Sequence, residues 1–132
     1  MYLLDTNICI YAMKGQFSQL NNHLFSYSPS EIAVSSITVF ELEYGACKSD
    51  WSERSRNNLK LFLAPFTILP FDTTDAAHAG NIRSFLVKHG CIIGPYDLLL
   101  AGQAIARGLT FVTHNTKEFQ RIPGLAIEDW VL

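Results

Sequence analysis

The chain has 132 residues, 48% of them hydrophobic, which is enough to bury one core. Its net charge of −2 argues against a protein that only holds nucleic acid on a basic surface. No apolar run is long enough to cross a membrane, and the first residues lack the basic region and cleavage site of a signal peptide. We therefore expect a single domain over residues 1–132, cytoplasmic and without a membrane contact.

Three dispersed cysteines, Cys9, Cys47 and Cys91, have apolar neighbours in the sequence. Their odd number and their spacing argue against a disulfide framework or a zinc site. We expect all three to be buried thiols in a reducing compartment.

Short apolar runs alternate with helical patterns along the chain. Strands are predicted at residues 2–4, 32–35, 66–71, 109–113 and, as a short last one, 126–130. Helices are predicted at residues 6–13, 17–25 and 95–106, and a further helix begins at an N-cap at Ser36. A polar connection at residues 49–58 leads to a short helix that ends near Leu63. A long helix runs from a cap at 72–74 to about residue 88. This alternation predicts an α/β fold with a central parallel sheet of four to five strands and helices on both faces.

Three acidic residues fall at strand ends or on helices that begin near them. Asp5 ends the first strand, Glu41 lies on the helix after the second, and Asp97 lies in the first turn of the helix that opens at Gly94-Pro95. The segment 113–115 follows a later strand and includes Asn115. In a doubly wound sheet these positions border one crevice outside the carboxyl ends of the strands. Mg²⁺ and Mn²⁺ prefer such oxygen ligands, and phosphodiester hydrolysis uses these ions.

Simpler interpretations exist for each acid. Asp5 can serve only as a helix cap, and Asp97 only as a favourable charge at a helix N-terminus, although its apolar flanks argue against an exposed position. Glu41 and Glu43 lie roughly 200° apart on a helix, so only one can face the crevice. We expect Glu41 to face it, beside a core stripe that includes Phe40, Tyr44 and Cys47.

The basic side chains Lys14, Arg83 and Arg107 are candidate phosphate contacts, with an ordinary solvated position as the equal alternative. His114 neighbours the proposed site, and we expect it at the surface or in a supporting position.

Four segments in order resemble the PIN-domain ribonucleases, and closely the VapC toxins of bacterial toxin–antitoxin pairs. They are residues 3–7 (LLDTN), 34–38 with 41–46 (VSSIT and ELEYGA), 93–97 (IGPYD) and 112–115 (VTHN). The third segment and the closing residues 121–125 and 128–130 most resemble the subgroup of initiator-tRNA-specific endonucleases. The resemblance covers nearly the whole chain.

The resemblance implies a toxin that hydrolyses RNA phosphodiester bonds, in initiator tRNA, with water activated by Mg²⁺ or Mn²⁺. It makes Asp5, Glu41 and Asp97 the metal ligands. Asn115 becomes the fourth site residue, where the family often has an aspartate, and Glu118 partly compensates for the missing charge. The hydroxyl groups of Thr6 and Thr113 would orient carboxylates or water. It also implies a VapB-type antitoxin as partner, and a homodimer.

Two other functions remain as alternatives. In a phosphatase-like hydrolase Asp5 would attack phosphorus directly, but such enzymes normally carry a second acid where this chain has Asn7. A non-catalytic binding module with a degraded site is favoured by Asn115 and disfavoured by the three intact acids.

Overall fold

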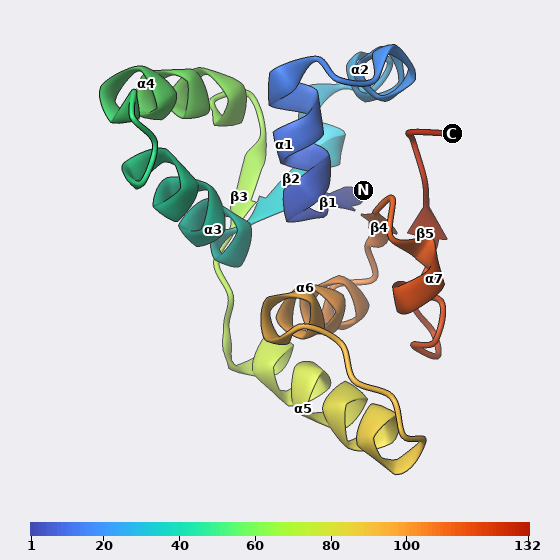
Figure 1. Cartoon of the computed structure of the whole chain (residues 1–132). Helices are drawn as coiled ribbons and strands as arrows, with labels where there is room; N and C mark the ends of the chain where they lie inside the picture. The colour runs from blue at the N-terminus through green and yellow to red at the C-terminus, as the bar shows by residue number, and fades with distance from the viewer.

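A five-stranded parallel sheet forms the centre of the molecule, with strand order β3-β2-β1-β4-β5 (Figure 1). The computed structural model describes all 132 residues. The strands are β1 (Tyr2–Leu4), β2 (Ile32–Ser35), β3 (Thr67–Leu69), β4 (Thr110–Val112) and β5 (Ile127–Glu128). The helices are α1 (Thr6–Lys14), α2 (Ser18–Phe25), α3 (Ser36–Cys47), α4 (Ser52–Leu63), α5 (Thr73–Lys88), α6 (Pro95–Ala106), α7 (Thr116–Phe119) and a 3₁₀ turn at Pro29–Glu31.

Helices cover both faces of this sheet, as the alternating pattern predicted. Successive strand residues point to opposite faces, so Leu3 packs in one core and Leu4 in the other. The core around Leu3 includes side chains of α5, α6 and α7, whereas the core around Leu4 includes side chains of α1, α2 and α4. Figure 1 shows α1 and α2 on one side of the strands and α5 and α6 on the other.

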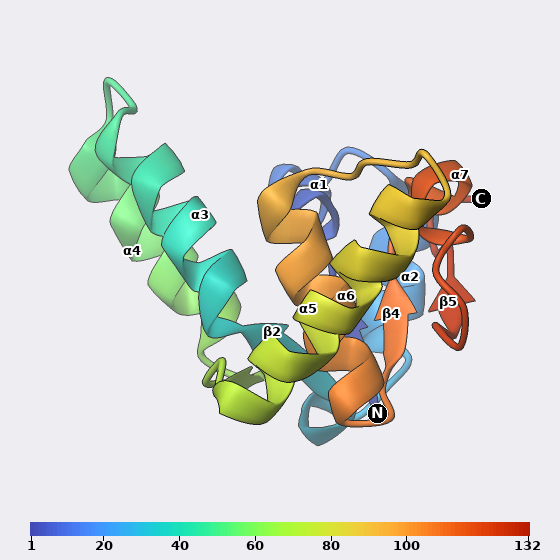
Figure 2. The same cartoon turned by 90° about the horizontal axis from the view of Figure 1, so that it is seen from below.

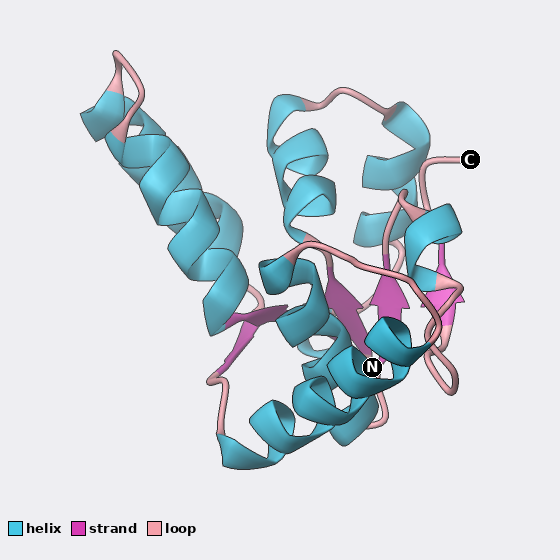
Figure 3. Ribbon diagram, turned by 60° about the horizontal axis from the view of Figure 1, so that its bottom comes forward, coloured by secondary structure: helices cyan, strands magenta, loops and turns pink.

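Two pairs of helices lie side by side. The α3–α4 hairpin projects from the sheet, as Figures 2 and 3 both show, and α5 packs along α6. The second pair approaches closely at Gly102, where a Cβ added to the glycine would lie only 2.7 Å from the backbone of Ala79. A glycine is therefore required where these two helices cross.

Most predicted elements are present, with shifted boundaries. Ser35, rather than Ser36, caps α3, because its hydroxyl accepts a hydrogen bond from the Ile37 N–H at 3.1 Å. Asp72 caps α5 as predicted, in a capping box with Asp75. The polar connection was predicted to reach residue 58, but α4 already begins at Ser52.

The predicted core stripe of α3 is wrong. Phe40 and Tyr44 are 53% and 61% exposed, and Cys47 is exposed as well. The expectation of three buried cysteines is also wrong, because Cys91 is only partly buried and Cys9 alone is buried. The buried residues of α3 are instead Thr38, Leu42 and Ala46. Apolar side chains surround most of this helix, so sequence spacing alone selected the wrong face. No helix is both long and apolar enough to span a membrane.

Candidate functional site

Asp5 is held at the carboxyl end of the central strand. Its backbone N–H donates to the carbonyl of Val112 at 2.9 Å, which extends the β1–β4 ladder to the end of the strand. Its side chain is 3% exposed and caps α1 by accepting from the Asn7 N–H at 3.4 Å. The other carboxylate oxygen accepts from the Thr113 hydroxyl at 2.8 Å. Capping is therefore real but does not use the whole carboxylate.

Glu41 is oriented by the first residue of α1. The Thr6 hydroxyl donates to Glu41 Oε2 at 2.5 Å and lies 3.0 Å from the Thr38 hydroxyl. Glu41 is half-buried, whereas Glu43 is exposed. This confirms the helical phase expected for the two glutamates. Thr38 was not singled out from sequence, since a threonine one turn before a glutamate is an unspecific signal.

Asp97 lies in the first turn of α6, after the N-terminal Pro95. Its carboxylate turns back toward the helix start, because a Cβ on Gly94 would lie 3.3 Å from Asp97 Oδ2. Burial, together with the charges of Asp5, Glu118 and Glu41, raises the pKa of Asp97 to about 6. The three predicted metal ligands thus share one electrostatic environment.

Asn115 joins the site through Glu118. Its backbone N–H donates to the Thr113 hydroxyl at 3.0 Å, and its side-chain amide donates to the Glu118 carboxylate. These contacts connect the end of β4 to α7. Because the Asn115 nitrogen is engaged, its amide oxygen is the atom available to a ligand. Glu118 brings the negative charge that Asn115 lacks.

No basic side chain neutralises this group of acids. The ion pairs of the molecule join Arg107 to Asp72 and Asp75, and His114 to Asp129. Burial raises the pKa of Asp5, the Thr113 hydroxyl opposes the rise, and the charge of Glu41 adds to it. A group of one buried and three partly buried carboxylates without a basic partner is electrostatically suited to a cation.

The donor set fits a hard divalent ion, since carboxylate and amide oxygens are what Mg²⁺ and Mn²⁺ bind. No three His, Cys, Asp or Glu side chains lie close enough to enclose an ion by themselves. Mg²⁺ is commonly held by one or two carboxylates with several waters retained. The residues present therefore fit an open site of that type, in which waters complete the coordination.

The three candidate phosphate contacts have different positions. Lys14 lines a groove of about 830 Å³ between α1, α3 and α4, and Glu41 lines the same groove. Arg83 lines a separate, mainly apolar groove between α5 and α6.

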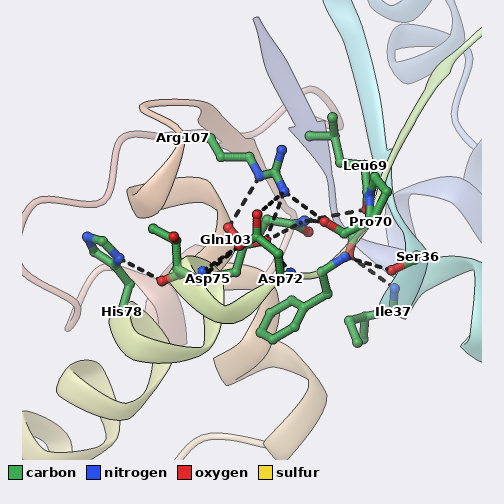
Figure 4. Close-up of polar contacts among 12 residues, drawn as sticks. Ser36, Ile37, Leu69, Pro70, Asp72, Asp75, His78, Gln103 and Arg107 are labelled. Atoms are coloured by element: carbon green, nitrogen blue, oxygen red, sulfur yellow. Dashed lines mark hydrogen bonds and ion pairs between the residues drawn. The ribbon is translucent and has the colours of Figure 1, made fainter.

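Arg107 is a structural residue rather than a phosphate contact. Its guanidinium donates to Asp75 at 3.2 and 3.0 Å and to the Pro70 carbonyl at 2.7 Å (Figure 4). It follows the last residue of α6, ten residues and roughly 15 Å of helix beyond Asp97. Gln103, which sequence reasoning did not identify, completes this network by donating to Asp75 at 3.2 Å. His114 is in the surface position expected, 3.0 Å from Asp129.

Comparison with known proteins identifies the family. The PIN domain profile matches residues 2–125. The chain belongs to the PIN-domain family, within its VapC group. It is 43% identical over 129 residues to the tRNA(fMet)-specific endonuclease VapC of Salmonella typhimurium, covering 98% of this chain and 97% of that one. It is 44% identical to ribonuclease VapC2 of Rickettsia felis, with 98% of both chains covered.

Solved structures of the VapC group share the whole fold. The chain matches the DNA-bound VapBC structure from Salmonella typhimurium with a TM-score of 0.93 at 43% identity, covering 98% of this chain and 97% of that one. It matches VapBC2 of Rickettsia felis, bound to a promoter DNA fragment, with a TM-score of 0.92 at 41% identity and 98% coverage of both chains. The predicted α/β fold and the sequence resemblance to VapC proteins are both confirmed.

Proposed function

We propose that this chain is the toxin of a VapBC pair, an endoribonuclease that hydrolyses phosphodiester bonds of initiator tRNA with a divalent metal ion. The observation that carries the proposal is a group of acids around the end of β1 that has no basic partner. The charges of Asp5, Glu118 and Glu41 all raise the pKa of Asp97 there. RNA cleavage is supported by the named activities of relatives above 40% identity. Initiator tRNA as substrate is supported by the name of one of them.

Asp5, Glu41 and Asp97 would hold a Mg²⁺ or Mn²⁺ ion, which polarises a phosphoryl group and supplies hydroxide for hydrolysis. The chain's own contribution is to keep these carboxylates oriented. Thr113 holds Asp5 and Thr6 holds Glu41, so neither carboxylate has to be ordered when the ligand arrives. Asn115 presents an amide oxygen without charge, so we propose one firmly bound ion, with a second recruited by RNA phosphate.

A VapB-type antitoxin is the proposed partner. Both neighbouring VapBC structures are complexes of the two kinds of protein. The groove between α1, α3 and α4 is mostly apolar and reaches Glu41, so a segment bound there would cover that carboxylate. A homodimer is proposed on the family resemblance alone.

Cleavage of purified initiator tRNA tests the function. Wild type, Asp97→Asn and the matched control Glu43→Gln are compared with Mg²⁺ and with EDTA. We expect a discrete cut that requires Mg²⁺, is lost in Asp97→Asn and persists in Glu43→Gln, because the Glu43 side chain is exposed.

Each other outcome removes a specific part of the proposal. Cleavage in EDTA, or by Asp97→Asn at the wild-type rate, would refute the metal assignment. Cleavage of other RNAs but not of initiator tRNA would refute the substrate only. If a folded protein neither cuts RNA nor binds Mg²⁺, the non-catalytic module becomes the better interpretation.

A further inference from the structure

Exposed aromatic side chains border the acidic site. Phe40 is 53% exposed, Tyr44 61% and Tyr96 43%, although each is large enough to stabilise a core by burial. Phe40 and Tyr96 come from different helices, α3 and α6, yet their ring centroids are 5.6 Å apart in a tilted arrangement. Two half-exposed rings in contact form a small apolar platform on the surface.

The two residues of the platform are sequence neighbours of proposed metal ligands. Phe40 immediately precedes Glu41, and Tyr96 immediately precedes Asp97. The two residues that carry the rings are therefore neighbours of the two carboxylates, one pair on each of two helices. A nucleotide whose phosphate lay at the cation that these carboxylates would hold would have its base or a neighbouring base within range of the rings.

A stripe along α3 continues this surface. Phe40, Tyr44 and Lys48 follow one another at intervals of four residues, so they share one face with a rise of about 6 Å between them. The Lys48 ammonium lies 5.1 Å from the centre of the Tyr44 ring. The order from the site outward is thus ring, ring and cation, all exposed. Exposed aromatic rings together with a basic group are typical of surfaces that bind single-stranded nucleic acid.

We infer that Phe40, Tyr96 and Tyr44 stack unpaired bases of the RNA substrate, and that Lys48 contacts a phosphate next to them. This inference rests on the proposed ribonuclease function. Paired bases are stacked within a helix and cannot lie flat against a protein ring, whereas bases of loops and single strands can. The substrate segment that reaches the site is therefore unpaired, and the aromatic residues position it for cleavage.

Binding measured without cleavage tests the inference apart from the nuclease function. All proteins carry Asp97→Asn and are kept in EDTA, and the probes are a short single-stranded RNA containing 2-aminopurine and a perfectly paired RNA hairpin stem. Fluorescence anisotropy gives the affinity, and 2-aminopurine quenching reports stacking. The added substitutions are Phe40→Ala, Tyr96→Ala and Tyr96→Phe. The matched control is Phe25→Ala, at the end of α2, where the ring is 73% exposed.

We expect Phe40→Ala and Tyr96→Ala each to weaken single-strand binding about tenfold and to reduce the quenching, because stacking of one base is lost. Tyr96→Phe keeps the ring and should retain affinity, and Phe25→Ala should change neither signal. The paired stem should bind more weakly and be insensitive to all four substitutions.

Two results would overturn the inference. One is wild-type affinity and quenching in both alanine variants. The other is a Phe40→Ala protein that sediments as a monomer where the parent is a dimer, with the RNA affinity per chain unchanged. That result would mean that the rings form an interface between two copies of the chain. If stacking is found but the parent protein cuts no RNA, the binding surface stands and the nuclease function fails.

Discussion

Neutralising a proposed catalytic carboxylate should make the metal-free protein more stable. The pKa of Asp97 is raised to about 6 from an ordinary value of 3.8 by burial and by the charges of Asp5, Glu118 and Glu41. A rise of this size corresponds to about 3 kcal/mol at most. Asp97 is only half-buried, and solvent screening reduces the figure to about 1–2 kcal/mol. Asp97→Asn removes this cost, and we expect Tm to rise by about 3–8 °C at pH 7.5 in EDTA.

The pH dependence distinguishes charge repulsion from a packing effect. The raised pKa means that the folded protein binds the proton more tightly than the unfolded chain, so stability falls as pH rises from the unfolded to the folded pKa. The cost is absent below about pH 4, grows between pH 4 and pH 6, and is complete above pH 6. The advantage of Asp97→Asn should follow the same course.

Thermal unfolding at several pH values, with EDTA and with Mg²⁺, measures both effects. Mg²⁺ should stabilise the wild type through binding to the folded state and stabilise Asp97→Asn far less. Glu43→Gln, which removes an exposed carboxylate, should change neither curve. The reasoning is refuted if Asp97→Asn is no more stable than wild type at pH 7.5, or if its advantage is the same at pH 4.

Three further results are expected. Glu41→Gln should lower kcat/KM for RNA cleavage by more than about 100-fold, because losing a metal ligand costs more than losing a contact that only supports one. Glu43→Gln should stay within about twofold of wild type, and equal losses would contradict the assigned helix face. Thr113→Val should weaken Mg²⁺ affinity by about 10- to 100-fold in titration calorimetry, since the Asp5 carboxylate loses its hydroxyl partner; unchanged affinity would show that the hydroxyl does not orient it. Gly102→Ala should lower the free energy of unfolding in urea by about 1–3 kcal/mol, because the added methyl meets the α5 backbone at 2.7 Å. The control Gly80→Ala has open space around it and should be neutral or stabilising. Similar losses in both variants would contradict the close packing.

The parts of the fold that sequence predicted are those with a strong local cause. β1 and β2 are short buried runs followed by capping residues, and the capping box of Asp72 and Asp75 marks the start of α5. α4 lacked such a signal, because its N-cap Trp51 makes no side-chain cap hydrogen bond and its first turns are polar. A polar start without a cap looks like a loop in sequence.

The tertiary arrangement of α3 could not be derived from its pattern. Phe40 and Tyr44 have the spacing of a core stripe, but the core takes Leu42 and Ala46, which lie about 200° away on the opposite face of the helix. The choice depends on where α1 and α4 lie, which no local pattern contains. The hydrogen bond between Gln103 and Asp75, 28 residues apart, is invisible to local patterns for the same reason. The expected position of Glu41 survived this error, since the phase of Glu41 against Glu43 does not depend on which aromatic residues are buried.

The strand order explains why acids distant in sequence share one site. Along the chain the sheet grows from β1 to β2 and β3 on one side, and then to β4 and β5 on the other. The carboxyl ends of β1 and β4 therefore open a crevice where the connections diverge, the usual place for ligands in such sheets. The hydrogen bond from Thr113 to Asp5 lies at this point and joins residues 108 positions apart. Like charges gathered there destabilise the empty fold, and the threonine hydroxyls offset part of that cost while leaving the acids free for a cation.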